Sequence, residues 1–256
     1  MPRFTAVFLD IHGVLIDGAA LQEPYAAAQA AFSAEHFGGA VEDWLEANRD
    51  VVRCRGDLLA DLDFRGPDGV RHRGVFERRA WEMMFRRVGL PVPDVDFEAM
   101  VCAEAHRFTR ESDALYPDAR EPLVRLAEGG LALHAISDAC AGHIRGCLEG
   151  AEVAHLFAGV HGYDNLNLGL KQPEYYRRAF TRAGLPASEA LCVEDSPDCV
   201  LFACEAGAAA VMVRRGERAR PGPGSASARA AEAALAVLED MAGLTGVLDG
   251  GAQAGG

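Results

Sequence analysis

Lysine is almost missing from this chain of 256 residues. Of its 25 basic residues, 24 are arginine and only Lys171 is a lysine. Such a bias is typical of a GC-rich genome, in which arginine has replaced lysine wherever the two are interchangeable. They are not interchangeable where a compact point charge must fit a small site, because a guanidinium is planar and larger. We therefore expect Lys171 to have a specific role.

Long apolar runs, paired cysteine motifs and an excess of positive charge are also missing. No apolar run approaches the roughly 20 residues of a membrane span, and the first residues, MPRFTAVFLD, lack the features of a signal peptide. The seven cysteines include no Cys-x-x-Cys pair, which favours free thiols in a reducing cytoplasm over disulfides or a zinc site. The net charge of −13 would repel nucleic acid. We expect a cytoplasmic protein that binds neither membranes nor nucleic acid, and the sequence leaves its oligomeric state open.

Short apolar runs alternate with helical stretches over much of the chain. Half of the residues are hydrophobic, which suits one α/β core and a smaller subdomain. The runs that are typical of buried strands cover residues 4–10, 131–137, 156–162, 190–195 and 209–213. The helical stretches between them cover residues 121–129, 141–150, 173–184 and 197–207. This alternation predicts a doubly wound parallel sheet with helices on both faces and its chemistry at the carboxyl ends of the strands.

The alternation is interrupted after the first strand. Residues 18–113 contain no convincing strand and are dominated by helical patterns, with a turn-rich connection at 64–74. We interpret them as an inserted helical subdomain, some of whose arginines face an anionic substrate. The core then comprises residues 1–17 and 114–245. After a Pro/Gly/Ser linker we expect one alanine-rich amphipathic helix, and a disordered tail over residues 246–256.

Four polar features follow the predicted strands in order. Asp10 emerges from a buried strand, where its carboxylate can attack phosphorus and form an aspartyl phosphate, and Gly13 permits a tight turn. Ser137 offers a hydroxyl after the next strand, followed by Asp138. Lys171 lies just before a helix and can neutralise the transferring phosphoryl group. Glu194 and Asp195 are paired carboxylates of the kind that a hard divalent cation prefers.

In this order and spacing the four features resemble the motifs of the haloacid dehalogenase superfamily. The resemblance covers nearly the whole chain, including LYPDAREPLVRLAEGG before the second motif and CVEDSPDCVLFACEAGAAAVMV at the fourth. It implies a helical cap inserted after the first motif. It also implies one Mg²⁺ held by Asp10, the backbone carbonyl of His12, and Glu194 and Asp195. Gly13, Ser137, Asp138 and Lys171 would then surround the phosphate of a small organic substrate.

His12 departs from the pattern of the superfamily's phosphatases, which carry an aspartate at that position as general acid and base. Three interpretations stay open. His12 can replace the aspartate, since imidazole is a common proton-transfer group and the nearby carboxylates would favour its charged form. Alternatively, His12 does not transfer protons, and the protein is a slow enzyme or serves in binding or regulation. Or the reaction differs, as in the dehalogenases, although these lack the acidic pair that Glu194 and Asp195 form here. The phosphonate-cleaving members of the superfamily use a Schiff-base lysine in the cap. That mechanism is excluded, because Lys171 is the only lysine and lies outside the predicted cap.

Overall fold

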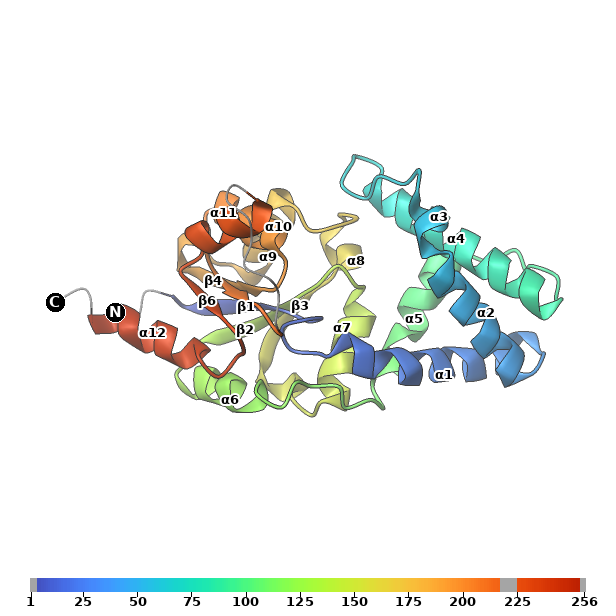
Figure 1. The fold of residues 1–256 in the computed structure, drawn as a ribbon, viewed down its shortest axis with the longest axis horizontal. Coiled ribbons are helices and arrows are strands. Elements are labelled where there is room, and N and C mark those ends of the chain that lie inside the picture. Colours follow the sequence, from blue (N-terminus) through green and yellow to red (C-terminus); the bar gives the residue numbers. More distant parts are fainter. Residues whose placement is uncertain (1–3, 217–224, 254–256) are drawn as a thin grey trace.

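A single parallel sheet forms the centre of the molecule in a computed structural model, which describes residues 4–216 and 225–253 (Figure 1). The strands lie in the order β3-β2-β1-β4-β5-β6, and every neighbouring pair is parallel. Their bounds are β1 Ala6–Asp10, β2 Ala132–Ile136, β3 Phe157–His161, β4 Ala190–Glu194, β5 Ala209–Val213 and β6 Ala236–Leu238. The sheet confirms the predicted doubly wound α/β fold.

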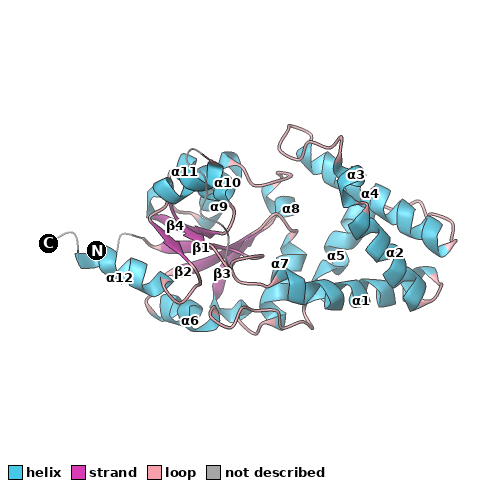
Figure 2. Ribbon diagram, in the orientation of Figure 1, coloured by secondary structure: helices cyan, strands magenta, loops and turns pink. Residues whose placement is uncertain are grey.

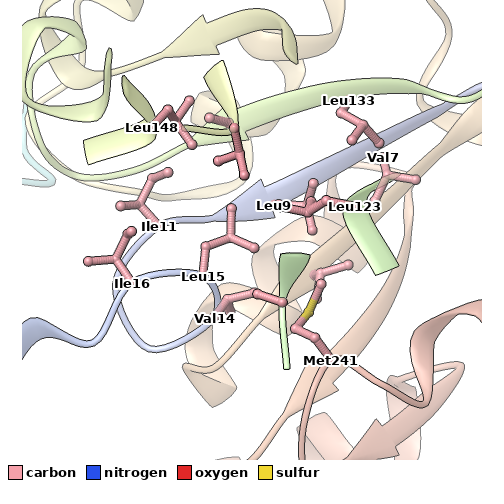
Figure 3. Close-up of a cluster of buried hydrophobic side chains, with 14 of the residues drawn as sticks. Val7, Leu9, Ile11, Val14, Leu15, Ile16, Leu123, Leu133, Leu148 and Met241 are labelled. Carbon is pink, nitrogen blue, oxygen red and sulfur yellow. The ribbon is translucent and has the colours of Figure 1, made fainter. Parts of the chain in front are cut away.

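Helices cover both faces of the sheet (Figures 1 and 2). One face carries α6 (Arg120–Glu128), α7 (Ala141–Gly150) and α12 (Leu244–Gln253), and the other carries α8 (Tyr163–Leu166), α9 (Pro173–Ala183), α10 (Pro197–Glu205) and α11 (Ala226–Ala233). Short 3₁₀ turns at Ala154–Leu156 and Ala187–Glu189 precede β3 and β4. Each face of the sheet has its own hydrophobic core: the first lies under α6, α7 and α12, and the second under α8 to α11. Along β1 the side chains alternate, so Val7 and Leu9 enter the first core and Phe8 enters the second. Figure 3 shows the first core around Leu9.

Five helices between β1 and β2 form a separate body beside the sheet, which we call the helical unit (Figure 1). They are α1 (Gly18–Phe37), α2 (Val41–Arg53), α3 (Arg55–Leu59), α4 (Gly69–Val88) and α5 (Phe97–Thr109). The unit has its own hydrophobic core, in which Trp44, Trp81 and Phe85 are almost fully buried. Helix α4 starts at Gly69, so the connection predicted over 64–74 is shorter than expected. The division into residues 18–113 and a core of 1–17 and 114–245 remains our proposal.

Helix α5 of the helical unit packs closely along α7 of the core, and glycines make this possible. Gly142, Gly146 and Gly150 are spaced by four residues and therefore lie on one face of α7. A Cβ atom at Gly142 would lie 2.8 Å from the carbonyl oxygen of Cys102, and one at Gly146 would lie 2.6 Å from that of His106. The backbones of the two helices are thus in direct contact.

The C-terminal region differs from the prediction of one helix followed by a disordered tail. Strand β6 interrupts the helical pattern because it pairs with β5, with Val211 opposite Ala236, and so satisfies backbone groups at the sheet edge. Helix α12 extends to Gln253, because Leu244 is fully buried in the core and Val247 packs against it. Residues 254–256 of the predicted tail lie outside the described residues. Among the described residues, no helix is long and apolar enough to cross a membrane.

Candidate active site

The predicted nucleophile and the acidic pair meet at the carboxyl edge of the sheet. Asp10 is the last residue of β1 and Glu194 the last of β4, and these strands are neighbours in register. Ser137 follows β2, which flanks β1 on the other side. The chain runs outward from β1 through β2 and β3 and then returns to β4, so the strand order reverses at β1. Such a switch point is where open α/β sheets bind their ligands.

Lys171 lies between two carboxylates at this switch point. Its Nζ is 2.8 Å from Oδ1 of Asp10 and 3.0 Å from both carboxylate oxygens of Glu194. The lysine is only 2% exposed. Burial alone would lower the pKa of Lys171, but the charges of Asp10 and Glu194 outweigh it and hold this pKa well above its usual range. The side chain is therefore an ammonium, as the composition argument expects.

Glu194 is fully buried, and its oxygens already have partners. Besides the two contacts from Lys171, the hydroxyl of Tyr176 donates a hydrogen bond of 2.7 Å to Oε1. Burial raises the pKa of Glu194, and Lys171 opposes that shift. These contacts suit a residue that orients the lysine. The neighbouring Asp195 is partly exposed and better placed for direct contact with an ion.

Position 13 requires a glycine for two reasons, its backbone conformation and its closeness to Asp195. Its φ of 84° lies in the left-handed region, and a Cβ atom there would overlap the carboxylate of Asp195. The turn after β1 is held by its own backbone, because the amide of Gly13 donates to the carbonyl of Ile16 at 3.0 Å. Gly13 thus keeps the Asp195 carboxylate close to the end of β1.

The carboxylates of this site suit a hard divalent cation. Ligand oxygens of Asp10, Glu194 and Asp195 lie within 4.8 Å of one another. With all three ionised and Lys171 protonated, the four side chains carry a net charge of −2, which one divalent cation would balance. Carboxylate oxygens are the donors that Mg²⁺ prefers. The donor set therefore fits the predicted ion.

Ser137 and Asp138 hold the loops that frame the site. Ser137 is 3% exposed, and its hydroxyl accepts a hydrogen bond of 3.3 Å from the amide of Ala139. Asp138 accepts a hydrogen bond of 2.6 Å from the amide of Lys171, which fixes the segment that carries the lysine. Burial raises the pKa of Asp138, while the charge of Lys171 opposes the shift. The contacts of Asp138 thus indicate a role in positioning Lys171.

Burial is the largest influence on the charge state of His12. Burial lowers its pKa, the charge of Asp10 raises it less, and the charge of Lys171 lowers it further. The charge of Asp10 favours the imidazolium as expected, but desolvation, which the sequence could not show, is the larger effect in this pocket. The Nε2 atom of His12 lies 3.1 Å from Nε2 of His143 on α7. Burial also lowers the pKa of His143, to about 3, so that ring is neutral.

The helical unit contributes side chains to the site that the sequence did not single out. Arg73 of α4 donates from Nε to the carbonyl of Gly169 at 2.8 Å, and its guanidinium lies 4.7 Å from the ring centre of Tyr163. Its Nη2 is buried and has no hydrogen-bond partner among the described residues. Arg65 donates to the carbonyl of Lys171 at 3.1 Å. The arginine-rich composition of residues 18–113 was the only sequence signal for these contacts.

Comparison with known proteins identifies the family. Residues 4–207 match the family model of haloacid dehalogenase-like hydrolases, so the chain belongs to this family and is a hydrolase. A search of curated proteins finds no match. Similar solved structures include a 2-haloacid dehalogenase from Pseudomonas syringae pv. Tomato DC3000, with 19% identity, a TM-score of 0.61, and coverage of 96% of this chain and 98% of that one.

Other similar structures are described in other terms. A HAD phosphatase from Thermococcus onnurineus is 20% identical, with a TM-score of 0.58 and coverage of 96% of this chain and 99% of that chain. A HAD-hydrolase from Bacillus subtilis, described as bound to magnesium, is 13% identical, with a TM-score of 0.60 and the same coverage. These similarities show the shared fold.

Proposed function

We propose that this protein is a Mg²⁺-dependent phosphatase that acts on a small organic phosphate through an aspartyl phosphate on Asp10. The observation that carries the proposal is the buried ammonium of Lys171, held between Asp10 and Glu194 with Asp195 close by. It supplies a positive charge where a phosphoryl group would meet the nucleophile. Asp10, Asp195 and the backbone carbonyl of His12 would hold the Mg²⁺, which neutralises phosphate charge when bound.

The reaction divides into two displacements at phosphorus. A carboxylate oxygen of Asp10 forms a bond to phosphorus while the bond to the leaving oxygen breaks, and that oxygen takes up a proton. Water then attacks phosphorus, gives up a proton, and restores the carboxylate as inorganic phosphate departs. Lys171 stays protonated throughout and offsets charge on the phosphoryl oxygens. Burial of Lys171 and Glu194 limits the competing access of water to these charges.

His12 is the group that we assign to proton transfer. In its neutral form, which the lowered pKa favours, the imidazole can accept the proton from the attacking water. In the first displacement it must begin protonated to serve the leaving oxygen. Because its pKa is lowered, that form is scarce at neutral pH. Esters with good leaving groups should therefore react faster than alkyl phosphates.

The helical unit serves as a cap in this proposal. It approaches the core at the segment that carries the lysine, where Arg65 and Arg73 bind the carbonyls of Lys171 and Gly169. The remaining donor of Arg73, Nη2, is buried and unused among the described residues. A polar or anionic group of the substrate beyond its phosphate would satisfy it. The substrate class is therefore a small phosphate ester with a second acceptor group.

The decisive experiment measures phosphate and halide release from a panel of phosphate esters and 2-haloacids, with Mg²⁺ and with excess chelator. We expect phosphate release that requires the cation. Asp10→Asn should abolish it, because an amide cannot form the acyl phosphate. The exposed Asp57→Asn on α3 makes the same chemical change outside the site and should be neutral. Halide release in chelator would replace this proposal with dehalogenation, and no turnover of either class would favour a binding role.

Substitution of His12 tests the assigned proton transfer. His12→Ala should slow hydrolysis of alkyl phosphates by about 10²–10⁴-fold and that of nitrophenyl phosphate far less. A nitrophenolate leaves without a proton, which is why the two substrates should separate. His12→Asp should retain or raise activity, since it restores a carboxylic acid above an unchanged backbone carbonyl. Equal loss with both leaving groups would remove His12 from the proposed mechanism.

A further inference from the structure

Beside the carboxylates, the structure brings together a second set of possible ligands of a different chemical type. His12 follows β1, while His143 and Cys147 lie one turn apart on α7. One ligand atom from each of these three residues lies within 4.8 Å of the other two. Cys147 is 1% exposed, and both histidines are partly buried. The three residues therefore converge from two elements on one point in the interior.

The spacing of the two imidazoles matches that of ligands on one metal ion. Their Nε2 atoms are 3.1 Å apart and their ring centres 5.1 Å apart. Two nitrogens at the zinc–nitrogen bond length of about 2.0–2.1 Å with tetrahedral angles are separated by about 3.3 Å. Residues at i and i+4 on a helix share one face, which aims Cys147 at the same point as His143.

We propose that His12, His143 and Cys147 form a site for a borderline-soft divalent transition-metal ion such as Zn²⁺, separate from the carboxylate site. Two imidazoles and a thiolate select such ions, whereas Mg²⁺ prefers oxygen. Binding releases one proton, from the thiol of Cys147. Each imidazole keeps a single proton, on Nδ1, so that both Nε2 lone pairs face the ion. The resulting charge of +1 lies next to the acidic cluster, whose net charge of −2 with all three carboxylates ionised favours it until Mg²⁺ balances that charge.

The proposed site has a consequence for turnover that rests on the proposed function. An ion bound to Nε2 of His12 removes that atom from proton transfer. Zn²⁺ should therefore inhibit the Mg²⁺-supported reaction, most strongly with poor leaving groups. The site could not be recognised from the sequence, because its ligands come from segments about 130 positions apart and no Cys-x-x-Cys pair is present.

A cobalt titration of the full-length protein tests the site without any turnover. With the carboxylate site saturated by Mg²⁺, one equivalent of Co²⁺ should produce the intense near-ultraviolet band of a thiolate–cobalt bond, and Zn²⁺ should abolish it. Cys147→Ser and, independently, His143→Gln should remove the band or weaken binding more than about 10-fold. Cys204→Ser, at a cysteine on α10 outside the cluster, should leave it unchanged.

Two further measurements complete the test. X-ray absorption of the zinc-loaded native protein should show one sulfur and two imidazole ligands, and it needs no variant that must fold. Cys147→Ser should keep Mg²⁺-dependent turnover and lose the inhibition by Zn²⁺. A weak cobalt spectrum that Cys147→Ser does not change, or zinc bound only by oxygen, would overturn the proposed site. Because Asp10→Asn has no turnover and should still give the cobalt band, failure of the phosphatase proposal would be distinguishable.

Discussion

Removing the charge of Lys171 should separate the stability of the site from its activity. Lys171→Met keeps a side chain of similar length but leaves the carboxylates of Asp10 and Glu194 facing each other without their shared cation. Breaking a buried ion pair by removing one partner costs about 3–5 kcal/mol. For a chain of this size that corresponds to a fall in Tm of about 6–20 °C, at 2–4 °C per kcal/mol. Loss of the positive charge should also reduce kcat by about 10²–10³-fold.

A second substitution tests whether the charges of Lys171 and Glu194 are coupled. In Lys171→Met combined with Glu194→Gln the unpaired buried charge of Glu194 is gone, so stability should recover partly while activity stays low. The coupling energy from the double-mutant cycle should be about 0.5–3 kcal/mol. The free energy of unfolding would be measured with urea and the kinetics with nitrophenyl phosphate, and Glu128→Gln at an exposed position of α6 serves as the control. Strictly additive losses of stability would refute the coupling of the two charges.

Four further substitutions test other parts of the structure. Burial lowers the pKa of His161 to about 4, so below pH 6.5 the unfolded state binds more protons than the folded state. This group should therefore lower the free energy of unfolding by about 2 kcal/mol between pH 7 and pH 5. In urea titrations, His161→Gln should show a smaller fall over the same range. Gly146→Ala should destabilise the protein by about 1–3 kcal/mol through overpacking against α5, although alanine normally favours a helix. Gly246→Ala in α12 has open space around it and should stabilise the protein. Thermal denaturation should show a lower Tm for the first variant and a higher Tm for the second. Arg73→Lys keeps the charge but loses the planar fork, so steady-state kinetics should show KM raised about 10–100-fold with kcat little changed.

Much of the core could be predicted from the sequence because its strands are buried on both faces. Five apolar runs matched β1 to β5 to within two residues, since a strand covered by helices must be apolar throughout. Strand β6 escaped prediction because its three residues lie in an alanine-rich segment with a helical pattern. Residues 236–238 form a strand only because they pair with the edge of β5, and that pairing depends on tertiary structure.

The candidate site was predictable where chemistry is tied to a strand end and unpredictable where it depends on packing. Asp10 and Glu194 are the last residues of buried strands, and Lys171 was conspicuous as the sole lysine. The contact between His12 and His143 could not be foreseen, because the position of α7 against the end of β1 is set by the fold. The lowering of the His12 pKa by burial could not be foreseen for a related reason, since the depth of burial is not written in the local sequence.

The single lysine makes the protein unusually easy to observe at its centre. Isotopically labelled lysine supplied during expression would mark one residue among 256, without any substitution. Its one side-chain amine signal in a magnetic resonance spectrum would come from the ammonium between Asp10 and Glu194. Binding of an ion, formation of the acyl phosphate and release of product would each change the field at that nitrogen. The composition that points to Lys171 therefore also provides a built-in probe of every state of the reaction.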